Sequence, residues 1–420
     1  MYITKNIKKP ELLAPAGSLN KLKYAIMYGA DAVYIGGEAF SLRVAAKNFT
    51  YDEIKEGIQF AHQRGKKVYI TANIIPHNDD LKSFPDFVKE VYNIGADAII
   101  ISDLGMFDMA HTAAPDLDIH ISTQANNTNY MSASVWHKLG AKRIILARDL
   151  SLNEISEIRE KLDNDCELET FVHGAMCISY SGRCLLSNFL TQRDANKGAC
   201  SHPCRWKYYL MEEKRPGEYM PVFENDRGTF IYNSKDLCMI NHIPELIKAG
   251  IDSFKIEGRV KNELYVATVV KAYRKAIDAY FDSLKNGTEY KLDAAISDSL
   301  KKVSHREYTT GFFFGKPDGN EQLYTSNTYI QDYMIAAVVK SYDKQTKIAV
   351  LEQRNKFLKG DTLEVLSADG DDFEFTVNEM YNSEGEPISS APHAQMEIRL
   401  KIEREVHQYD ILRVETGDKK

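Results

Sequence analysis

Residues 1 to about 260 repeat one pattern of hydrophobic and polar positions: a short apolar run, a polar turn and an amphipathic stretch of helical period. Short apolar runs without alternation are typical of parallel strands buried on both faces. We predict eight such strands, at Glu11–Pro15, Ala32–Gly36, Lys67–Asn73, Ala98–Asp103, Asp118–Gln124, Arg143–Arg148, Glu167–Gly174 and Ser253–Arg259. Eight strands alternating with helices predict a (β/α)8 TIM-like barrel, with a doubly wound open sheet as the alternative.

The pattern changes twice after the seventh predicted strand. Residues 175 to about 251 form a connection far longer than the roughly 2–6 residues that usually join a strand to a helix, which indicates a functional insertion. From about Tyr333 the hydrophobic period becomes two, which is typical of short strands with one buried face. We therefore predict a barrel domain over 1–285, a polar linker over 286–330 and a small β-barrel domain over 331–420.

Composition narrows the class of protein. The chain has 420 residues with 53 Lys and Arg against 60 Asp and Glu, a net charge of −7, and a mean hydropathy of −0.39. No apolar run approaches the roughly 18 residues of a membrane span, and the basic N-terminus lacks the apolar stretch of a signal peptide. We expect a cytoplasmic globular protein. Its mild acidity disfavours indiscriminate nucleic-acid binding but allows a local basic site.

Four of the six cysteines lie close together in the sequence, within the first part of the predicted insertion. Their spacing is C-x6-C-x15-C-x3-C, at Cys177, Cys184, Cys200 and Cys204. Four thiolates suit zinc or an iron–sulfur cluster, and the wide first spacing favours the cluster because zinc ribbons pair their cysteines more closely. The alternative is four unconnected buried thiols. Cys238 is an alternate ligand.

The residues around the first two cysteines carry a specific motif. Glu169 to Ser187 reads ETFVHGAMCISYSGRCLLS and matches the signature E-x-F-x2-G-A-M-C-x4-G-x-C-x-L-S of peptidase family thirty-two, a collagenase-like family of unknown catalytic type. The chain resembles this family over essentially its whole length. Within the family it looks most similar to the proteins of prephenate-dependent hydroxylation of the tRNA wobble uridine. Other branches look similar to 23S rRNA cytidine hydroxylation factors and to anaerobic ubiquinone hydroxylation proteins.

The resemblance implies a tRNA-modifying enzyme that forms 5-hydroxyuridine with prephenate as co-substrate. It also implies a 4Fe–4S cluster on Cys177, Cys184, Cys200 and Cys204, with the fourth ligand in some branches at a position like Cys238. A paralogous partner protein or a homo-oligomer is a further expectation.

A dicarboxylate such as prephenate needs cationic groups, and arginine binds carboxylates bidentately. The predicted strand ends, which in a barrel surround the active-site mouth, supply candidates. We predict substrate-binding roles for Arg43, Asn73, Gln124, Arg148 and Arg259, and catalytic roles for His173, Lys255 and Glu257. Each cation taken singly is more often a salt-bridge partner than a ligand, so their convergence at one mouth would be the informative observation.

Basic and aromatic residues alternate just after the fourth cysteine, at Arg205, Trp206 and Lys207. Lysine and arginine hold phosphates while aromatic rings stack on unpaired bases, so this segment is a candidate RNA-binding site. The alternative is a solvated loop whose Trp packs on the barrel.

Two other functions stay open. A peptidase is the first, but the chain has neither an H-E-x-x-H zinc motif nor a G-x-S-x-G nucleophile motif, and its cysteines form a ligand-like set. A non-catalytic scaffold that binds tRNA is the second.

Overall fold

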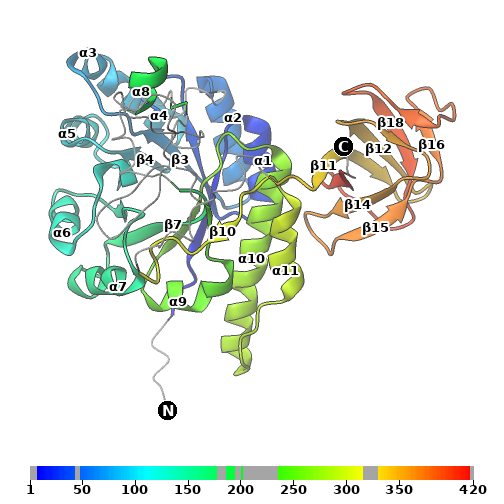
Figure 1. Cartoon of the computed structure of the whole chain (residues 1–420). Coiled ribbons are helices and arrows are strands. Elements are labelled where there is room, and N and C mark those ends of the chain that lie inside the picture. The colour runs from blue at the N-terminus through cyan, green and yellow to red at the C-terminus, as the bar shows by residue number, and fades with distance from the viewer. Residues whose placement is uncertain are drawn as a thin grey trace, which may run out of the picture.

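The computed structural model describes residues 7–42, 48–176, 186–193, 200–201, 235–315 and 330–416. Figure 1 shows a barrel ringed by helices, with a second, all-β domain beside it. The barrel strands are β1 (Glu11–Pro15), β2 (Ala32–Gly36), β3 (Lys67–Ala72), β4 (Ala98–Ile101), β5 (Asp118–Ile121), β6 (Arg143–Ile145), β7 (Glu167–Ala175) and β9 (Ser253–Ile256).

The eight strands close into a barrel. Strands β1 to β7 pair in sequence order and in parallel, and β9 pairs in parallel with both β1 and β7. The predicted TIM-like barrel is therefore confirmed and the open sheet is wrong. The strands differ from the predicted bounds at their carboxyl ends: β9 ends at Ile256, so Glu257 lies beyond it, whereas β7 continues to Ala175.

Amphipathic helices cover the outside of the barrel. Several begin with a side-chain cap, such as Thr50, which forms a reciprocal capping box with Glu53. Gly95 ends one helix with φ 99°, a left-handed conformation that favours glycine. The helices are α1 (Leu19–Met27), α2 (Tyr51–His62), α3 (Asn78–Leu81), α4 (Phe84–Ile94), α5 (Leu104–Ala113), α6 (Tyr130–Lys138), α7 (Leu152–Lys161), α9 (Ile243–Lys248) and α10 (Glu263–Asn286).

Short elements from the predicted insertion and linker lie against the barrel. Strand β8 (Asp236–Cys238) pairs antiparallel with β7, and β10 (Tyr308–Thr309) pairs in parallel with β8. Helix α8 (Leu186–Thr191) lies at the opposite end of the barrel from the start of β1 (Figure 1). After α10, helix α11 (Ala294–Ser299) and the segment to residue 315 pack Leu300, Val303 and Phe313 into the barrel core.

The C-terminal domain is an antiparallel half-barrel, consistent with the predicted class of small β-domain. Its strands are β11 (Tyr333–Asp343), β12 (Ile348–Gln353), β14 (Thr362–Leu366), β15 (Phe373–Thr376), β16 (Met380–Asn382), β18 (Glu397–Lys401) and β19 (Ile411–Glu415), in the order β15-β14-β19-β11-β12-β18-β16. A two-stranded ribbon, β13 (Phe357–Leu358) with β17 (Ser390–Ala391), completes it. Alternate residues such as Leu351 and Leu400 form its own core.

Buried polar contacts join the two domains. Lys271 on α10 donates from Nζ to the carbonyl oxygens of Ser367 (2.6 Å) and Gly370 (2.8 Å) and to Asp372 Oδ1 (2.6 Å). The hydroxyl of Tyr28 donates to the carbonyl oxygen of Leu366 at 2.7 Å. Among the described residues, no helix combines the length and the apolar character needed to cross a membrane.

Candidate active site at the barrel mouth

A network of buried charges fills the interior below the barrel mouth. Glu169 on β7 accepts from Lys255 Nζ at 2.7 Å and from Arg143 Nη1 at 3.0 Å. Arg143, only 4 % exposed, also donates to Glu11 (2.6 Å) and to Glu167 (2.7 Å). Glu169, the first residue of the cysteine motif, is thus also a buried carboxylate that binds two cations inside the barrel.

The sequence prediction missed Glu11, Arg143 and Glu169 as members of this network. The sequence does contain a sign of their burial, because each is a charged residue within or at the start of a strand that is otherwise largely apolar. Such a residue must find a partner inside, since an unpaired buried charge costs several kcal/mol. Spacing alone does not say which partners meet, because they come from four different strands.

Burial and neighbouring charges shift the protonation equilibria of this network. Burial by itself lowers the pKa of Arg143, but the carboxylates of Glu11 and Glu169 more than offset it and raise that pKa. Burial also lowers the pKa of Lys255, and the attraction of Glu169 offsets only part of this effect. Two aromatic rings also lie near Lys255 Nζ, with ring centres 4.5 Å away for Tyr34 and 5.5 Å away for Phe171.

Arg259 belongs to a second buried cluster that holds the loop after β2. Its Nη1 donates to Ser41 Oγ and to the carbonyl oxygen of Leu42, each at 2.8 Å. Ser41 Oγ in turn lies 2.6 Å from Thr71 Oγ1 on β3. A Cβ at Gly36 would lie 2.1 Å from Arg259 Nη2 and 2.3 Å from Ser41 Oγ, so a larger residue there would displace this cluster. Arg259 therefore positions the loop that leads to the predicted ligand Arg43.

Three other predicted binding residues line the rim of the mouth. Asn73 donates from Nδ2 to Ser122 Oγ at 3.3 Å and accepts from the Leu42 amide at 3.3 Å. Arg148 lies over the ring of Phe171, with 3.9 Å from Cζ to the ring centre, and donates from Nη1 to the Ala175 carbonyl oxygen. Within the described part of the chain, Arg148 Nε and Gln124 Oε1 are buried without a hydrogen-bond partner. These atoms are suited to a polar ligand at the mouth.

The four predicted cations thus have different surroundings. Lys255 and Arg259 are both 4 % exposed and have protein partners, whereas Arg148 is partly exposed at the rim. Arg43 lies outside the described residues. Glu257 follows β9 next to Gly174, where a Cβ would lie 2.6 Å from the Glu257 carbonyl oxygen. Of the described cations, Arg148 therefore lies at the rim of the mouth, whereas Lys255 and Arg259 lie inside and are paired with protein groups.

His173 lies outside the barrel interior, between β7 and the helix α10. Its ring, 1 % exposed, contacts Tyr273 of α10 (5.5 Å between ring centres) and Tyr308 of β10 (5.4 Å). Burial, with the nearby His305 and Lys261, lowers the pKa of His173 to about 3. Its neutral imidazole packs among these rings, away from the lumen in which Lys255 meets Glu169.

Cys238 is opposite His173 in the β7–β8 pairing and is also buried. Burial raises the pKa of its thiol to about 11, against a smaller opposite effect of its hydrogen bond with Tyr273. A cysteine–histidine peptidase needs a thiolate beside an imidazolium. Both pKa shifts run in the opposite direction, so this pair is unsuited to that chemistry.

Because His173 is buried in its neutral form, we expect stability to depend on its protonation. In the unfolded chain its pKa is near 6.5, so between pH 6.5 and 3 the unfolded state binds more protons and the free energy of unfolding falls as pH falls. The slope approaches about 1.4 kcal/mol per pH unit for one such group. Urea titrations from pH 7 to 5 should show that the free energy of unfolding falls less steeply with falling pH in His173→Phe than in the wild type. Equal slopes would contradict the burial of a neutral His173.

Most of the predicted cysteine and RNA-binding residues lie outside the described residues, namely Cys177, Cys184, Cys204, Arg205, Trp206 and Lys207. Cys200 is described and is partly exposed. Within the described ranges, no three His, Cys, Asp or Glu side chains are grouped so as to hold a metal ion.

A cluster of hydroxyl groups joins the chain that follows Cys184 to the chain at Cys200. Ser187 Oγ on α8 accepts from the Ser201 amide at 3.0 Å, and Thr191 Oγ1 lies 2.9 Å from Ser201 Oγ. Ser187 is three residues after Cys184, and Ser201 is adjacent to Cys200. Two segments that each contribute a predicted ligand are therefore held together.

Comparison with known proteins identifies the family. The model of peptidase family U32 matches residues 17–323, and that of the family's C-terminal domain matches residues 331–413. The chain belongs to peptidase family U32.

Relatives in this family match nearly the whole chain. It is 40 % identical to tRNA hydroxylation protein P1 of Bacillus subtilis over 406 residues, covering 97 % of this chain and 95 % of that protein. It is 39 % identical to tRNA hydroxylation protein P of Escherichia coli, covering 91 % and 92 % of the two chains. An uncharacterized protease of Methanocaldococcus jannaschii is 43 % identical over 363 residues, covering 85 % of this chain and 86 % of that protein.

Proposed function

We propose that this protein hydroxylates tRNA, converting the wobble uridine to 5-hydroxyuridine with prephenate as co-substrate. The observation that carries the proposal is the 40 % identity to tRNA hydroxylation protein P1 over 97 % of the chain, which spans both domains. A second relative, 34 % identical over 359 residues, is the 23S rRNA 5-hydroxycytidine C2501 synthase of Escherichia coli. Hydroxylation of RNA is common to both names.

The proposed cofactor is an iron–sulfur cluster held by Cys177, Cys184, Cys200 and Cys204. The hydroxyl cluster supports this ligand set, since Ser187 and Ser201 draw together the chain that follows Cys184 and the chain at Cys200. When bound, such a cluster supplies one-electron transfer. Cys238 is the weaker candidate for fourth ligand, because its thiol is buried against Tyr273 behind β7.

The barrel mouth is the proposed site for prephenate. Arg148 offers a partly exposed guanidinium at the rim, and Gln124 offers a buried oxygen that has no partner among the described residues. Lys255 lies deeper, with Nζ 2.7 Å from Glu169 Oε1, so its amino group is already occupied by a protein partner beneath the mouth. Arg259 and Asn73 both bind the backbone of Leu42, the residue that precedes Arg43 in the sequence.

Complementation of cells that lack their own tRNA hydroxylation proteins tests the function. Expression of the wild type should restore 5-hydroxyuridine-type nucleosides, measured by mass spectrometry of hydrolysed tRNA, and Cys200→Ser should restore less than about a tenth of that level. Cys238→Ser should restore most of it and should keep its iron after anaerobic purification. Loss of iron in Cys238→Ser would reassign the fourth ligand.

The same strains separate the alternatives. An unchanged nucleoside profile together with cysteine-dependent cleavage of denatured collagen would favour a peptidase. Binding of tRNA with neither modification nor proteolysis would favour a scaffold. Either result would overturn the proposed hydroxylation.

A further inference from the structure

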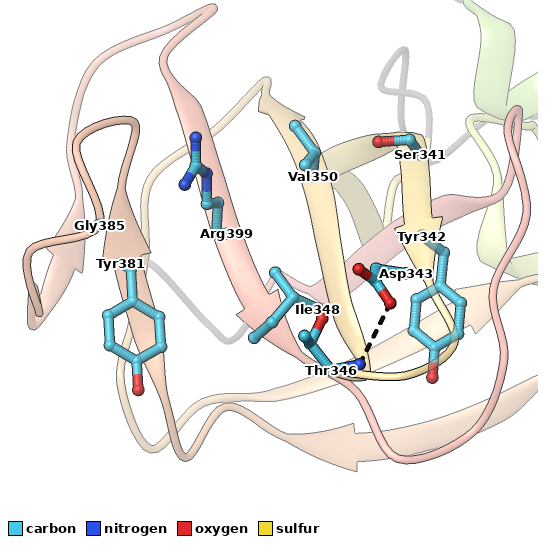
Figure 2. A pocket seen from close by; sticks show the side chains of 9 residues that line it. All are labelled: Ser341, Tyr342, Asp343, Thr346, Ile348, Val350, Tyr381, Gly385 and Arg399. Atoms are coloured by element: carbon cyan, nitrogen blue, oxygen red, sulfur yellow. Dashed lines mark hydrogen bonds between the residues drawn. The ribbon is translucent and has the colours of Figure 1, made fainter.

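The C-terminal domain has an open pocket of about 470 Å³ on the solvent-facing side of its sheet. Figure 2 shows Tyr342 and Tyr381 on its two flanks, Ile348 and Val350 on the floor between them, and Arg399 and Asp343 as its charged groups. The pocket lies entirely within 330–416, apart from the barrel mouth and from the cysteine motif.

Strand register places most of the pocket residues, but not Tyr342, on one face of the sheet. Val350 of β12 is opposite Ser341 of β11 on one side and Arg399 of β18 on the other, and Arg399 is in turn opposite Tyr381 of β16. Residues that are directly opposite in neighbouring strands point to the same face of the sheet. The intervening residues Leu351 and Leu400 are buried in the domain core, so the row that contains Arg399 faces solvent.

The two aromatic rings of the pocket come from different faces of the sheet. Tyr342 is opposite the buried Ala349, packs against the domain core and donates to the carbonyl oxygen of Ile402 at 2.9 Å. Tyr381 is in the same row as Arg399, donates to Glu379 Oε2 at 2.8 Å and remains only partly buried. A ring that is fixed at one end and exposed on its face can stack on a planar ligand with little further loss of conformational freedom.

The two charged groups of the pocket differ in sign. Arg399 has only a long contact with a carboxylate, 3.8 Å to Glu397, and its Nε has no hydrogen-bond partner among the described residues. Asp343 accepts two backbone amides on Oδ1, from Gln345 (2.8 Å) and Thr346 (3.1 Å), which lower the pKa of its carboxyl and keep it ionised. The pocket therefore suits an anionic group near Arg399 and a hydrogen-bond donor near Asp343.

We propose that this pocket binds one unpaired nucleotide of RNA, with the base against the ring of Tyr381, a phosphate at Arg399 and a ribose hydroxyl or base amino group at Asp343. A nucleotide combines a planar ring, an anion and a donor within one unit, which are the three features that the pocket matches. The proposal rests on the proposed function, since it gives the RNA substrate a second contact, on the C-terminal domain.

Binding of an unpaired RNA to the full-length protein tests this site. A fluorescein-labelled single-stranded RNA of about 12 nucleotides, long enough for one such domain, serves as the probe in fluorescence anisotropy. Tyr381→Ala should weaken binding by about 5- to 150-fold, the effect of removing one stacking ring. Arg399→Ala should reduce the slope of log affinity against log salt by about one phosphate contact.

Matched variants separate a binding role from a structural one. Tyr381→Phe keeps the ring and should bind within about twofold of the wild type. Tyr92→Ala and Arg64→Ala remove the same types of side chain from exposed positions on the barrel and should leave affinity unchanged. Melting temperatures should be the same for all five variants, because none of these side chains lies in a core.

The outcomes also distinguish this site from the proposed function. Unchanged affinity and salt dependence in Tyr381→Ala and Arg399→Ala would overturn the site and leave tRNA hydroxylation intact. Weakened RNA binding in these variants, with no modified nucleoside produced by the wild type, would support the site and overturn the function. A wild type that binds no RNA would overturn both.

Discussion

Replacing Arg143 by methionine is expected to lower the free energy of unfolding by about 3–5 kcal/mol. The guanidinium is 4 % exposed and donates to Glu11, Glu167 and Glu169 inside the barrel. Its removal leaves Lys255 as the only described cation paired with Glu169, and it leaves Glu11 without its ion pair. Urea unfolding at pH 7, followed by circular dichroism, measures the loss.

The pH dependence of that loss identifies its cause. Burial by itself raises the pKa of Glu167, and Arg143 more than offsets this effect, so the pKa lies below its usual value. Without Arg143 the buried carboxylates should bind protons more readily, so the deficit of the variant should shrink as pH falls from 7 to 5. Lys161→Met, which breaks an exposed pair with Glu157, is the control and should leave the free energy of unfolding nearly unchanged. A small loss of stability in Arg143→Met that does not vary with pH would contradict the role of Arg143 as the partner of these buried carboxylates.

Glu364→Gln is expected to cost about 3–5 kcal/mol, because a buried arginine in the C-terminal domain, Arg413, loses its hydrogen-bonded carboxylate and keeps the longer 3.8 Å contact with Asp372. Arg413 is 0 % exposed and donates to both carboxylate oxygens of Glu364, at 2.8 and 3.1 Å. The same guanidinium reaches Thr268 of α10 at 3.4 Å, and Lys302 donates to Glu364 from the barrel side. The pair therefore lies in the contact between the domains.

Hydrogen exchange read separately over the two domains measures this effect. Glu364→Gln should speed exchange in β14 and β19, while β1 to β3 of the barrel keep the wild-type rates. The double variant Glu364→Leu with Arg413→Met removes both charges and should recover most of the lost stability. Glu403→Gln, in an exposed pair with Lys347, is the control and should change little. A double variant as unstable as the single one would show that packing, not charge, determines the loss.

Much of the fold could be predicted from local pattern alone. Apolar runs such as Ala98–Ile101 became buried parallel strands because both faces of such a strand are covered. The change of period after Tyr333 marked the antiparallel domain, since one face of its sheet is solvated. The spacing of the cysteines along the sequence likewise predicted a ligand set, although most of these cysteines lie outside the residues that the structure describes.

Tertiary structure decided where individual side chains point. Simple alternation along β7 places His173 on the same face as Glu169 and Phe171, inside the barrel, but a register irregularity between Phe171 and His173 accompanies its position against α10. Barrel closure likewise brought Lys255 to Glu169, 86 residues apart. Local sequence determined the strands, because periodicity is a local property. The partners of each charge and the face of each residue depended on register and closure, which are properties of the whole sheet.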